Sequence, residues 1–310
     1  MKIAFLFPGQ GSQFAGMGAG LARDWPAARA VFEQADQTLG FAISRLCFEG
    51  PEEQLKLTEN TQPALLATSV AALAVLRELG VNPDVVAGHS LGEYSALVAA
   101  GSLDFVDAIR LVRKRGQFMQ QAVPAGLGAM AALLRLPEDK LDSVLAEAAQ
   151  GEVIGAANLN SLDQIVIAGH KGAVERAIEL AKAAGARRAV LLPVSAPFHC
   201  ELMRPAQEKM RVELDGASFS DLNVPLVNNW QAMEVTLASD AREGLYQQIP
   251  NPVRWTESIR RLSSAAVGHV IEVGPGSVLC GLCRQIDREL KCTPFGEPED
   301  IEKLRAARGA

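Results

Sequence analysis

The sequence predicts an α/β fold in which a small domain is inserted into a larger one with a mainly parallel sheet. Short apolar runs typical of buried strands alternate with helical segments along most of the chain, which indicates a sheet covered by helices on both faces. Between residues 126 and 194 the order becomes strand, helix, strand, strand, helix, strand, as in ferredoxin-like domains. We therefore expect a large domain of residues 1–124 and 197–310 and an inserted domain of residues 125–196.

The composition indicates a globular enzyme rather than a disordered or fibrous protein. The chain has 310 residues, of which 48% are hydrophobic and 21% are charged. Its net charge of -6 argues against general nucleic-acid binding, which needs a basic face. The first apolar run, residues 3–7, is too short for a signal-peptide core, and we expect no membrane span, so we expect a cytoplasmic location. Five cysteines, an odd number, argue against a disulfide framework and for a reducing compartment.

Residues 3–7 read as the first buried strand, and a glycine-containing loop, residues 8–13, follows it. A dinucleotide-binding loop is excluded because the third glycine of its motif would fall on Phe14, and no Gly-Lys-Ser/Thr follows. What remains is a loop with exposed backbone N–H groups at the carboxyl end of a strand, where open α/β sheets place their sites. Such a loop is suited to stabilise an oxyanion.

Two helices follow in this part of the chain. Residues 62–79 are apolar on nearly every face, which predicts a buried helix. Residues 104–121 form a helix in which most basic residues lie outside the apolar arc, whereas Arg115 lies inside it. A buried cation is costly unless an acceptor meets it, so Arg115 either binds a carboxylate or other acceptor, forms an internal salt bridge, or reaches solvent near a helix end.

Between these helices, an apolar run at residues 85–87 leads directly into Gly-His-Ser-Leu-Gly. This is the nucleophile elbow pattern, a sharp turn from strand to helix that exposes Ser90, with glycines where a side chain would collide with backbone. The N–H of Leu91 at the helix start is then free to bind an oxyanion. The alternative is a glycine-rich turn with a capping serine.

The inserted domain is expected to contain strands at residues 129–134, 153–157, 164–168 and 189–194, with helices at 137–149 and 171–184. Asn158 and Asn160 fall in the connection between the two middle strands, where asparagines often form turns. After the insert, the pattern predicts a loop at residues 195–199, a helix at 200–214, a strand at 224–227, a helix beginning near Trp255 and a strand at 269–273.

Cys280 and Cys283 form a Cys-x-x-Cys pair in the helix that follows the last of these strands. One such pair supplies only half of a four-ligand zinc site, and no second pair exists in the sequence. Both thiols would lie on the early turns of the helix rather than at its first residue, where redox motifs place the reactive thiol. We interpret them as small packing residues.

A serine nucleophile needs a base, which is usually histidine. His89 is adjacent to Ser90 and its side chain would point elsewhere, while His170 opens a helix and His269 begins an apolar strand. His199 lies on a loop and follows the serine in chain order, as in α/β-hydrolases, so we predict that it is the base. No aspartate is clearly placed as a third member.

Eight motifs occur in order along the chain: FPGQGSQ from Phe7, TQPALLA from Thr61, GHSLGE from Gly88, RG-x-FMQ from Arg115, AANLNS from Ala156, APFHC from Ala196, NPV-x-W from Asn251 and EVGPG from Glu272. Together they resemble the malonyl-CoA:acyl carrier protein transacylases of fatty-acid synthesis. The resemblance extends to about residue 286. It implies an α/β-hydrolase-like large domain with a ferredoxin-like insert.

The resemblance also implies a ping-pong reaction without a metal or redox cofactor. Ser90, activated by His199, would take the malonyl group from malonyl-CoA, and the phosphopantetheine thiol of holo acyl carrier protein would then receive it. The N–H groups of Gln10 and Leu91 would form the oxyanion hole. In this family a main-chain carbonyl orients the histidine, and alignment assigns it to Gln248.

By the same resemblance, Arg115 would pair bidentately with the malonyl carboxylate, Gln62 would line its pocket, and the ring of Phe198 would disfavour a 2-methyl branch. The resemblance assigns three further residues to substrate binding: His89, Asn158 and Asn160. Alternatives of similar chemistry are a malonyltransferase serving a polyketide synthase or a malonate decarboxylase. A serine thioesterase and a non-catalytic carrier-binding module are the other candidates, although Arg115 argues against the first and the presence of Ser90 and His199 against the second.

Overall fold

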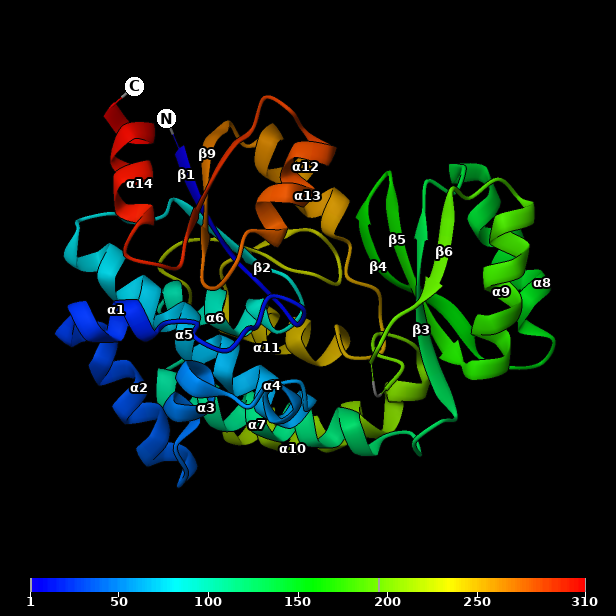
Figure 1. Ribbon diagram of the computed structural model, residues 1–310, viewed down its shortest axis with the longest axis horizontal. Coiled ribbons are helices and arrows are strands. Elements are labelled where there is room, and N and C mark those ends of the chain that lie inside the picture. The colour runs from blue at the N-terminus through cyan, green and yellow to red at the C-terminus, as the bar shows by residue number, and fades with distance from the viewer. Residues whose placement is uncertain (1, 195, 310) are drawn as a thin grey trace.

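The computed structural model describes residues 2–194 and 196–309. Its strands form two sheets, one of six strands and one of four (Figure 1). The four-stranded sheet lies to one side of the molecule, carries helices α8 and α9 on its outer face, and is continuous in sequence (Figure 1). This arrangement confirms the predicted α/β fold class, while the exact boundaries at residues 124 and 197 stay a prediction.

The six-stranded sheet has the strand order β10-β9-β1-β2-β7-β8. Every neighbouring pair is parallel except β7 and β8. The bounds are β1 Lys2–Phe7, β2 Val85–Gly88, β7 Leu226–Val227, β8 Glu234–Val235, β9 Val267–Val273 and β10 Lys291–Phe295. Because β1 and β2 are parallel, their carboxyl ends lie at the same edge of the sheet, and there the loop after β1 meets the elbow after β2.

Alternation along β1 shows how both faces of this sheet are covered. Ala4 and Leu6 pack in one cluster with α12 and α13, whereas Phe5 and Phe7 pack in another with α5, α6 and α7. All four side chains are fully buried. Burial of each large apolar side chain stabilises the fold by about 1.5–3 kcal/mol, so a sheet with two apolar faces needs a helical layer on each.

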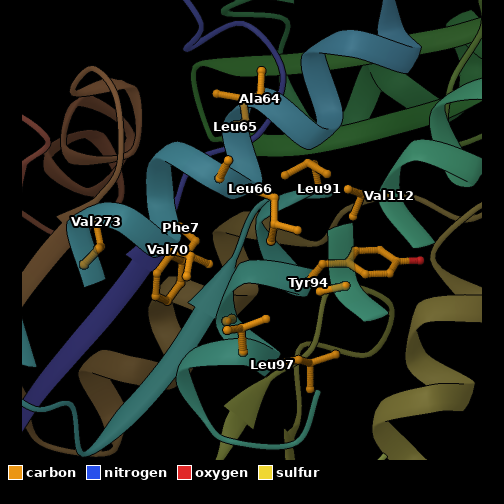
Figure 2. Packing of buried hydrophobic residues seen from close by; sticks show 14 of the residues in the cluster. Phe7, Ala64, Leu65, Leu66, Val70, Leu91, Tyr94, Leu97, Val112 and Val273 are labelled. Carbon is orange, nitrogen blue, oxygen red and sulfur yellow. The ribbon is translucent and has the colours of Figure 1, made fainter. Parts of the chain in front are cut away.

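The helices of the large domain are α1 Ala19–Asp24, α2 Pro26–Leu39, α3 Ile43–Glu49, α4 Glu52–Leu55, α5 Thr58–Glu78, α6 Gly92–Ala99, α7 Phe105–Gln121, α10 Arg204–Gly216, α11 Ala238–Gln247, α12 Trp255–Ser264, α13 Val278–Ile286 and α14 Asp300–Gly309. A short 3₁₀ segment, Glu201–Met203, precedes α10. Figure 2 shows α5 and α6 meeting in the main core, where Leu66, Leu91 and Leu97 lie together with Tyr94.

Helix α5 begins about one turn earlier than the sequence pattern predicts, because Pro63 lies inside the helix rather than at its start. Proline has no N–H, so the carbonyl of Glu59, four residues earlier, loses its helical partner. Arg113 replaces that partner by donating from Nη1 to the Glu59 carbonyl oxygen at 2.6 Å. The hydrogen bond lets α5 extend through the proline and ties it to α7.

The small sheet has the order β4-β5-β3-β6 and is antiparallel throughout. Its elements are β3 Gly128–Leu134, a 3₁₀ segment Glu138–Lys140, α8 Leu141–Ala149, β4 Ile154–Ser161, β5 Gln164–His170, α9 Lys171–Ala183 and β6 Arg188–Leu191. This is the predicted ferredoxin-like order. Ala131 and Leu133 of β3 pack under α8 and α9, whereas Met130 points into the main core of the large domain.

The prediction that Asn158 and Asn160 lie in a connection is wrong, because both belong to β4. The strand continues past residue 157 because its outer edge pairs with the large domain. The N–H of Leu159 donates to the carbonyl of Val253, and the N–H of Val253 donates to the carbonyl of Ala157, both at 2.9 Å. Irregular register within β4 accompanies this extension. The predicted loop before His199 also includes Ser195, which lies outside the described residues.

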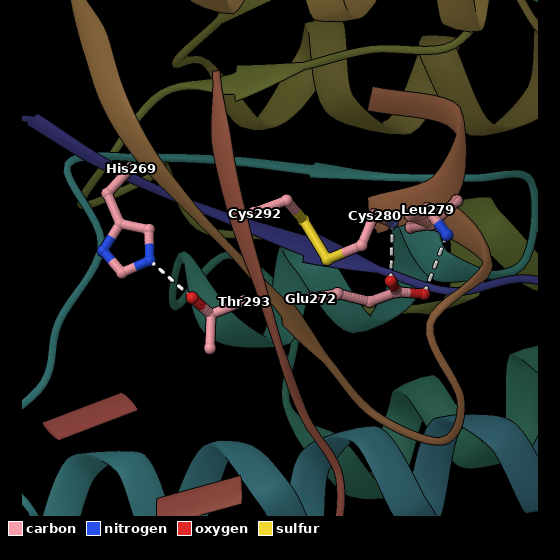
Figure 3. Close-up of a disulfide and its surroundings, with 6 residues drawn as sticks. All are labelled: His269, Glu272, Leu279, Cys280, Cys292 and Thr293. Atoms are coloured by element: carbon pink, nitrogen blue, oxygen red, sulfur yellow. Dashed lines mark hydrogen bonds between the residues drawn. A yellow bond between two sulfur atoms is a disulfide. The ribbon is translucent and has the colours of Figure 1, made fainter. Parts of the chain in front are cut away.

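The interpretation of Cys280 as a packing residue is also wrong. The structure joins Cys280, on α13, to Cys292, on the edge strand β10, in a disulfide (Figure 3). Cys283 is a free, buried thiol, in agreement with the interpretation made for it. Figure 3 also shows Glu272 accepting hydrogen bonds from the N–H groups of Leu279 and Cys280 at the start of α13. Among the described helices, none is long and apolar enough to cross a membrane.

Candidate active site

Ser90 occupies the turn between β2 and α6, with a positive φ of 51° that few non-glycine residues adopt. Glycines on either side make this turn sterically possible. A Cβ on Gly88 would overlap the backbone of Gly92, and a Cβ on Gly92 would overlap the carbonyl oxygen of Phe7 in β1. The elbow therefore presses directly against the neighbouring strand, and the serine hydroxyl projects from its tip.

His199 lies beside this hydroxyl. Its Nε2 is 2.7 Å from Ser90 Oγ, and its Nδ1 is 2.8 Å from the main-chain oxygen of Gln248. Because a carbonyl oxygen can only accept, Nδ1 carries the proton and Nε2 is left to accept one from the serine. Burial, followed by the nearby positive charge of Arg115, lowers the pKa of His199 to about 3, so the imidazole is neutral at physiological pH.

Arg115 is fully buried on α7 and reaches the same hydroxyl. Its Nη1 donates to Gln62 Oε1 at 2.8 Å, and its Nη2 donates to Ser90 Oγ at 3.1 Å and to Gln248 Oε1 at 2.6 Å. The guanidinium also lies over the ring of Tyr94, 5.7 Å from its centroid. Among the described residues no carboxylate forms an ion pair with it, and its Nε has no hydrogen-bond partner. All three acceptors are neutral.

The side chain of Gln248 therefore takes part in the site together with its main chain. Its Nε2 donates to Glu93 Oε2 at 2.8 Å, while its Oε1 accepts from Arg115. Glu93 is fully buried on α6. Burial raises the pKa of Glu93 to about 7, although hydrogen bonds from the N–H of Asn229 and from Gln248 act in the opposite direction.

The loop after β1 closes the other side of the site. A Cβ on Gly9 would overlap the carbonyl oxygen of His89, so this loop touches the elbow backbone. Gln10 Oε1 accepts from Gln62 Nε2 at 3.3 Å, which links the loop to the residue that holds Arg115. Leu91 is the N-cap of α6, so its N–H lies at the helix start next to Ser90.

The remaining residues predicted to bind substrate differ in the residues that surround them. Phe198 is buried beside His199 and belongs to the main core. Nε2 of His89 is 2.8 Å from Asn160 Oδ1, and its ring packs edge-on against Trp255. Asn158, also buried, pairs with Val253 through the backbone and has no side-chain hydrogen bond to another described residue. His89 therefore joins the elbow to the small sheet.

A model of the acyl transferase domain family matches residues 4–295. The malonyl CoA-acyl carrier protein transacylase of Bacillus subtilis (strain 168) is 52% identical over 302 residues, which cover 97% of this chain and 95% of the relative. The chain belongs to the malonyl CoA-acyl carrier protein transacylase family.

Solved structures agree with this family assignment. The 1.7 Å crystal structure of an acyl carrier protein S-malonyltransferase from Vibrio cholerae has a TM-score of 0.96 and 46% identity, and the match covers 98% of this chain and all of that one. A malonyl-transacylase in complex with a type II PKS acyl-carrier protein has a TM-score of 0.96 and 45% identity, with 99% and 100% coverage. The family fold thus extends over nearly the whole chain.

The motifs that carry the family resemblance do not by themselves point to Asn229, which the sequence analysis missed. Its Oδ1 accepts from the N–H of Ser90 at 2.6 Å, and its Nδ2 donates to the carbonyl of Gly88 at 2.6 Å. Asn229 therefore clamps the elbow from both sides of its turn. A signal existed, because two asparagines directly follow the buried strand β7 at the edge of the sheet where the site lies.

One group of possible metal ligands occurs among the described residues, formed by Glu272, Cys280 and Cys292. It does not fit a metal ion, because the two sulfurs are joined in the disulfide and both carboxylate oxygens already accept backbone hydrogen bonds. The group lies at the start of α13 (Figure 3), whereas Ser90 lies in the turn between β2 and α6.

Proposed function

We propose that the protein transfers a malonyl group from malonyl-CoA to the phosphopantetheine thiol of holo acyl carrier protein through a malonyl-serine intermediate on Ser90. The observation that carries this proposal is the environment of Arg115. A fully buried cation lies within hydrogen-bond distance of the serine hydroxyl, and its three hydrogen-bond acceptors are neutral oxygens. Its charge is therefore available to a carboxylate on the acyl group, and a guanidinium can bind such a carboxylate through two hydrogen bonds.

In the first half-reaction, His199 Nε2 accepts the proton of Ser90 as Oγ attacks the thioester carbonyl carbon. The N–H groups of Gln10 and Leu91 stabilise the tetrahedral oxyanion. The carbon–sulfur bond then breaks, and the imidazolium returns its proton to the departing thiolate of coenzyme A. In the second half-reaction the thiol of acyl carrier protein gives its proton to His199 and attacks the malonyl-serine ester, and Ser90 recovers its hydrogen.

The Gln248 carbonyl orients His199 in place of a carboxylate. A neutral oxygen stabilises the imidazolium less than an aspartate would, but a thioester is more reactive than an amide and needs weaker activation. Transfer in both directions between two thiols is therefore favoured. In this scheme no metal or redox cofactor takes part, since acyl exchange between thiols and a serine changes no oxidation state.

We assign supporting roles to the other residues around the site. Gln62 holds the guanidinium of Arg115, and the ring of Phe198 limits the space beside the acyl α-carbon. A set of polar residues from the elbow and β4 would contact the substrate on the side of the small sheet: His89, Asn158 and Asn160. A cytoplasmic location stays a prediction. The Cys280–Cys292 disulfide argues against the reducing compartment that was inferred from the odd number of cysteines.

The pathway that the carrier protein serves is a second question. A malonyl-transacylase solved with a type II PKS acyl-carrier protein is 45% identical to this chain, so a polyketide carrier is a specific alternative acceptor to a fatty-acid carrier. A malonate decarboxylase shares the chemistry but no observation favours it. A thioesterase would use water as the acceptor and would have no need for Arg115.

Intact-mass measurement tests the proposal. Incubation with malonyl-CoA should add one malonyl group to the protein, and subsequent addition of holo acyl carrier protein should remove it and add the same mass to the carrier. Ser90→Ala should form no adduct. Loss of the adduct to water at the same rate with and without carrier would identify a thioesterase, and an adduct that persists in Ser90→Ala would disprove the assignment of the nucleophile. Parallel reactions with carriers from both pathways would rank the acceptors.

A further inference from the structure

Glu93 is a buried carboxylate that the reaction scheme above does not use. It lies on α6, three residues after the nucleophile, and is fully buried. One oxygen, Oε2, accepts hydrogen bonds from the N–H of Asn229 at 3.0 Å and from Gln248 Nε2 at 2.8 Å. The other, Oε1, has no hydrogen-bond partner among the described residues. A buried polar oxygen without a hydrogen bond destabilises the fold, so the presence of Glu93 at this position needs a physical reason.

The side chain of Gln248 lies between this carboxyl group and the cation of Arg115. An amide has one end that accepts and one that donates, and here the accepting end meets Arg115 at 2.6 Å while the donating end meets Glu93 at 2.8 Å. The reversed orientation would place an NH₂ group against guanidinium donors and an oxygen against a carboxylate. The accepting Oε2 of Glu93 on one side and the donating guanidinium of Arg115 on the other therefore determine which way the Gln248 amide faces.

The amide also keeps the two charges apart. A glutamate in direct contact with Arg115 would neutralise the guanidinium and compete with a carboxylate on the substrate. With Gln248 between them, Glu93 orients Arg115 through a neutral oxygen, and Gln62 holds the opposite nitrogen at 2.8 Å. The guanidinium is thus fixed at both of its outer nitrogens without losing its attraction for an anion.

We propose that Glu93 is a positioning residue for acyl-group selection, which acts through the Gln248 side chain to hold Arg115 ready for a carboxylate beside Ser90. This inference rests on the proposed function and adds Glu93 to the residues that determine its acyl-group specificity. A second route from Glu93 to the site has to be distinguished from this one, because the same oxygen of Glu93 also accepts from the N–H of Asn229, whose side chain accepts from the N–H of Ser90. Action through Asn229 would affect every acyl group equally, whereas action through Gln248 would affect acyl groups that carry a carboxylate.

The test compares Glu93→Met, which keeps the length of the side chain but replaces the carboxyl oxygens with a weakly accepting sulfur, with Glu93→Gln, which keeps an oxygen at the same reach. Rates of acyl-serine formation are measured by intact mass with malonyl-CoA and with acetyl-CoA. Glu93→Met should lower the ratio of malonyl to acetyl rates at least tenfold, and Glu93→Gln should restore most of it. Glu272→Met is the matched control, because Glu272 is another buried carboxylate that accepts two N–H groups, but at α13. It should leave the ratio unchanged.

A second variant tests the route and does not depend on the folding of Glu93→Met. Gln248→Ala retains the main-chain carbonyl that orients His199 and removes the amide, so it should lower the same ratio by a similar factor. In the Gln248→Ala background, Glu93→Met should change the ratio little further. A wild-type ratio in Gln248→Ala, or equal losses of malonyl and acetyl rates in Glu93→Met, would overturn the inference. Failure of the wild-type protein to form a malonyl adduct would instead refute the proposed function.

Discussion

Replacement of Arg115 by alanine should convert a malonyl-selective site into one that no longer distinguishes malonyl from acetyl groups. The guanidinium presents Nη1 and Nη2 in one buried plane beside Ser90 Oγ. A carboxylate can accept from the remaining N–H of Nη1 and can replace Ser90 Oγ as an acceptor at Nη2, which gives two charge-assisted hydrogen bonds, each with a net value of about 1.5–3 kcal/mol. The smaller total, about 3 kcal/mol, corresponds to a loss of roughly 150-fold in kcat/KM. The malonyl reaction should fall by at least this factor, while the acetyl reaction has no carboxylate to lose.

The assay measures kcat/KM for transfer to holo acyl carrier protein from malonyl-CoA and from acetyl-CoA, with thermal melting as a control for the fold. Arg115→Lys is the informative comparison. Lysine retains the charge but offers a point charge in place of two fixed donors, so its malonyl rate should lie between those of wild type and Arg115→Ala. Equal losses for both acyl groups in Arg115→Ala would refute the specificity argument and make Arg115 a structural residue.

Four further outcomes are expected. His199→Ala should slow serine acylation by orders of magnitude, because no other described side chain is placed to accept the Ser90 proton. The pKa of His199 is lowered to about 3, so protonation of this imidazole should not reduce the acylation rate of the wild type between pH 8 and pH 5. The same shift means that the unfolded chain binds a proton between about pH 6.5 and pH 3 that the folded chain does not, so the free energy of unfolding decreases as the pH is lowered through this range. In urea titrations, His199→Gln should reduce this decrease by ~2 kcal/mol between pH 6.5 and 4.5. Gly92→Ala should lower the free energy of unfolding by ~3 kcal/mol, because its Cβ would overlap the Phe7 carbonyl, and a melting temperature equal to wild type would contradict this geometry. Cys292→Ser should lower the free energy of unfolding by about 3 kcal/mol in the loop-entropy model, without changing the transfer rate. A thiol count on the oxidised, denatured wild type should find three free cysteines, and a count of five would contradict the disulfide.

The parts of the site that the sequence predicts best are local ones. The elbow follows from glycines at fixed offsets from Ser90 along a continuous strand, turn and helix, and the structure contains the positive φ and the close approach to β1 that this pattern requires. Its hydrogen bond to His199 connects residues far apart in the sequence, but His199 was one of only four histidines, and its loop position distinguished it. The catalytic role assigned to each residue stays a prediction until it is measured.

The parts that the sequence analysis missed depend on contacts between distant elements. Asn158 and Asn160 read as turn residues because asparagine is common in turns, whereas pairing with Val253 extends the strand through them. The Cys-x-x-Cys spacing relates Cys280 only to Cys283, its neighbour in sequence. Its true partner, Cys292, lies on β10, a strand whose pattern is obscured by a proline that only an edge strand tolerates.

The side chain of Gln248 was missed for another reason. Alignment assigns a role only to its main-chain oxygen, and that role does not depend on the side chain. The structure contains the expected hydrogen bond to His199, but it also places the amide between Glu93 and Arg115. No pattern in one sequence indicates that an anion and a cation on different helices share one glutamine.

The pairing of β4 with Val253 couples movement of the small domain to the chemistry. Val253 lies only five residues after Gln248, whose carbonyl orients the base, and its two backbone hydrogen bonds attach this segment to the edge of the small sheet. A rotation of the insert would pull on the same stretch of chain and shift His199 relative to Ser90. Exchange of the whole insert between family members should therefore alter the acylation rate, unless the matching residues around Val253 are exchanged with it.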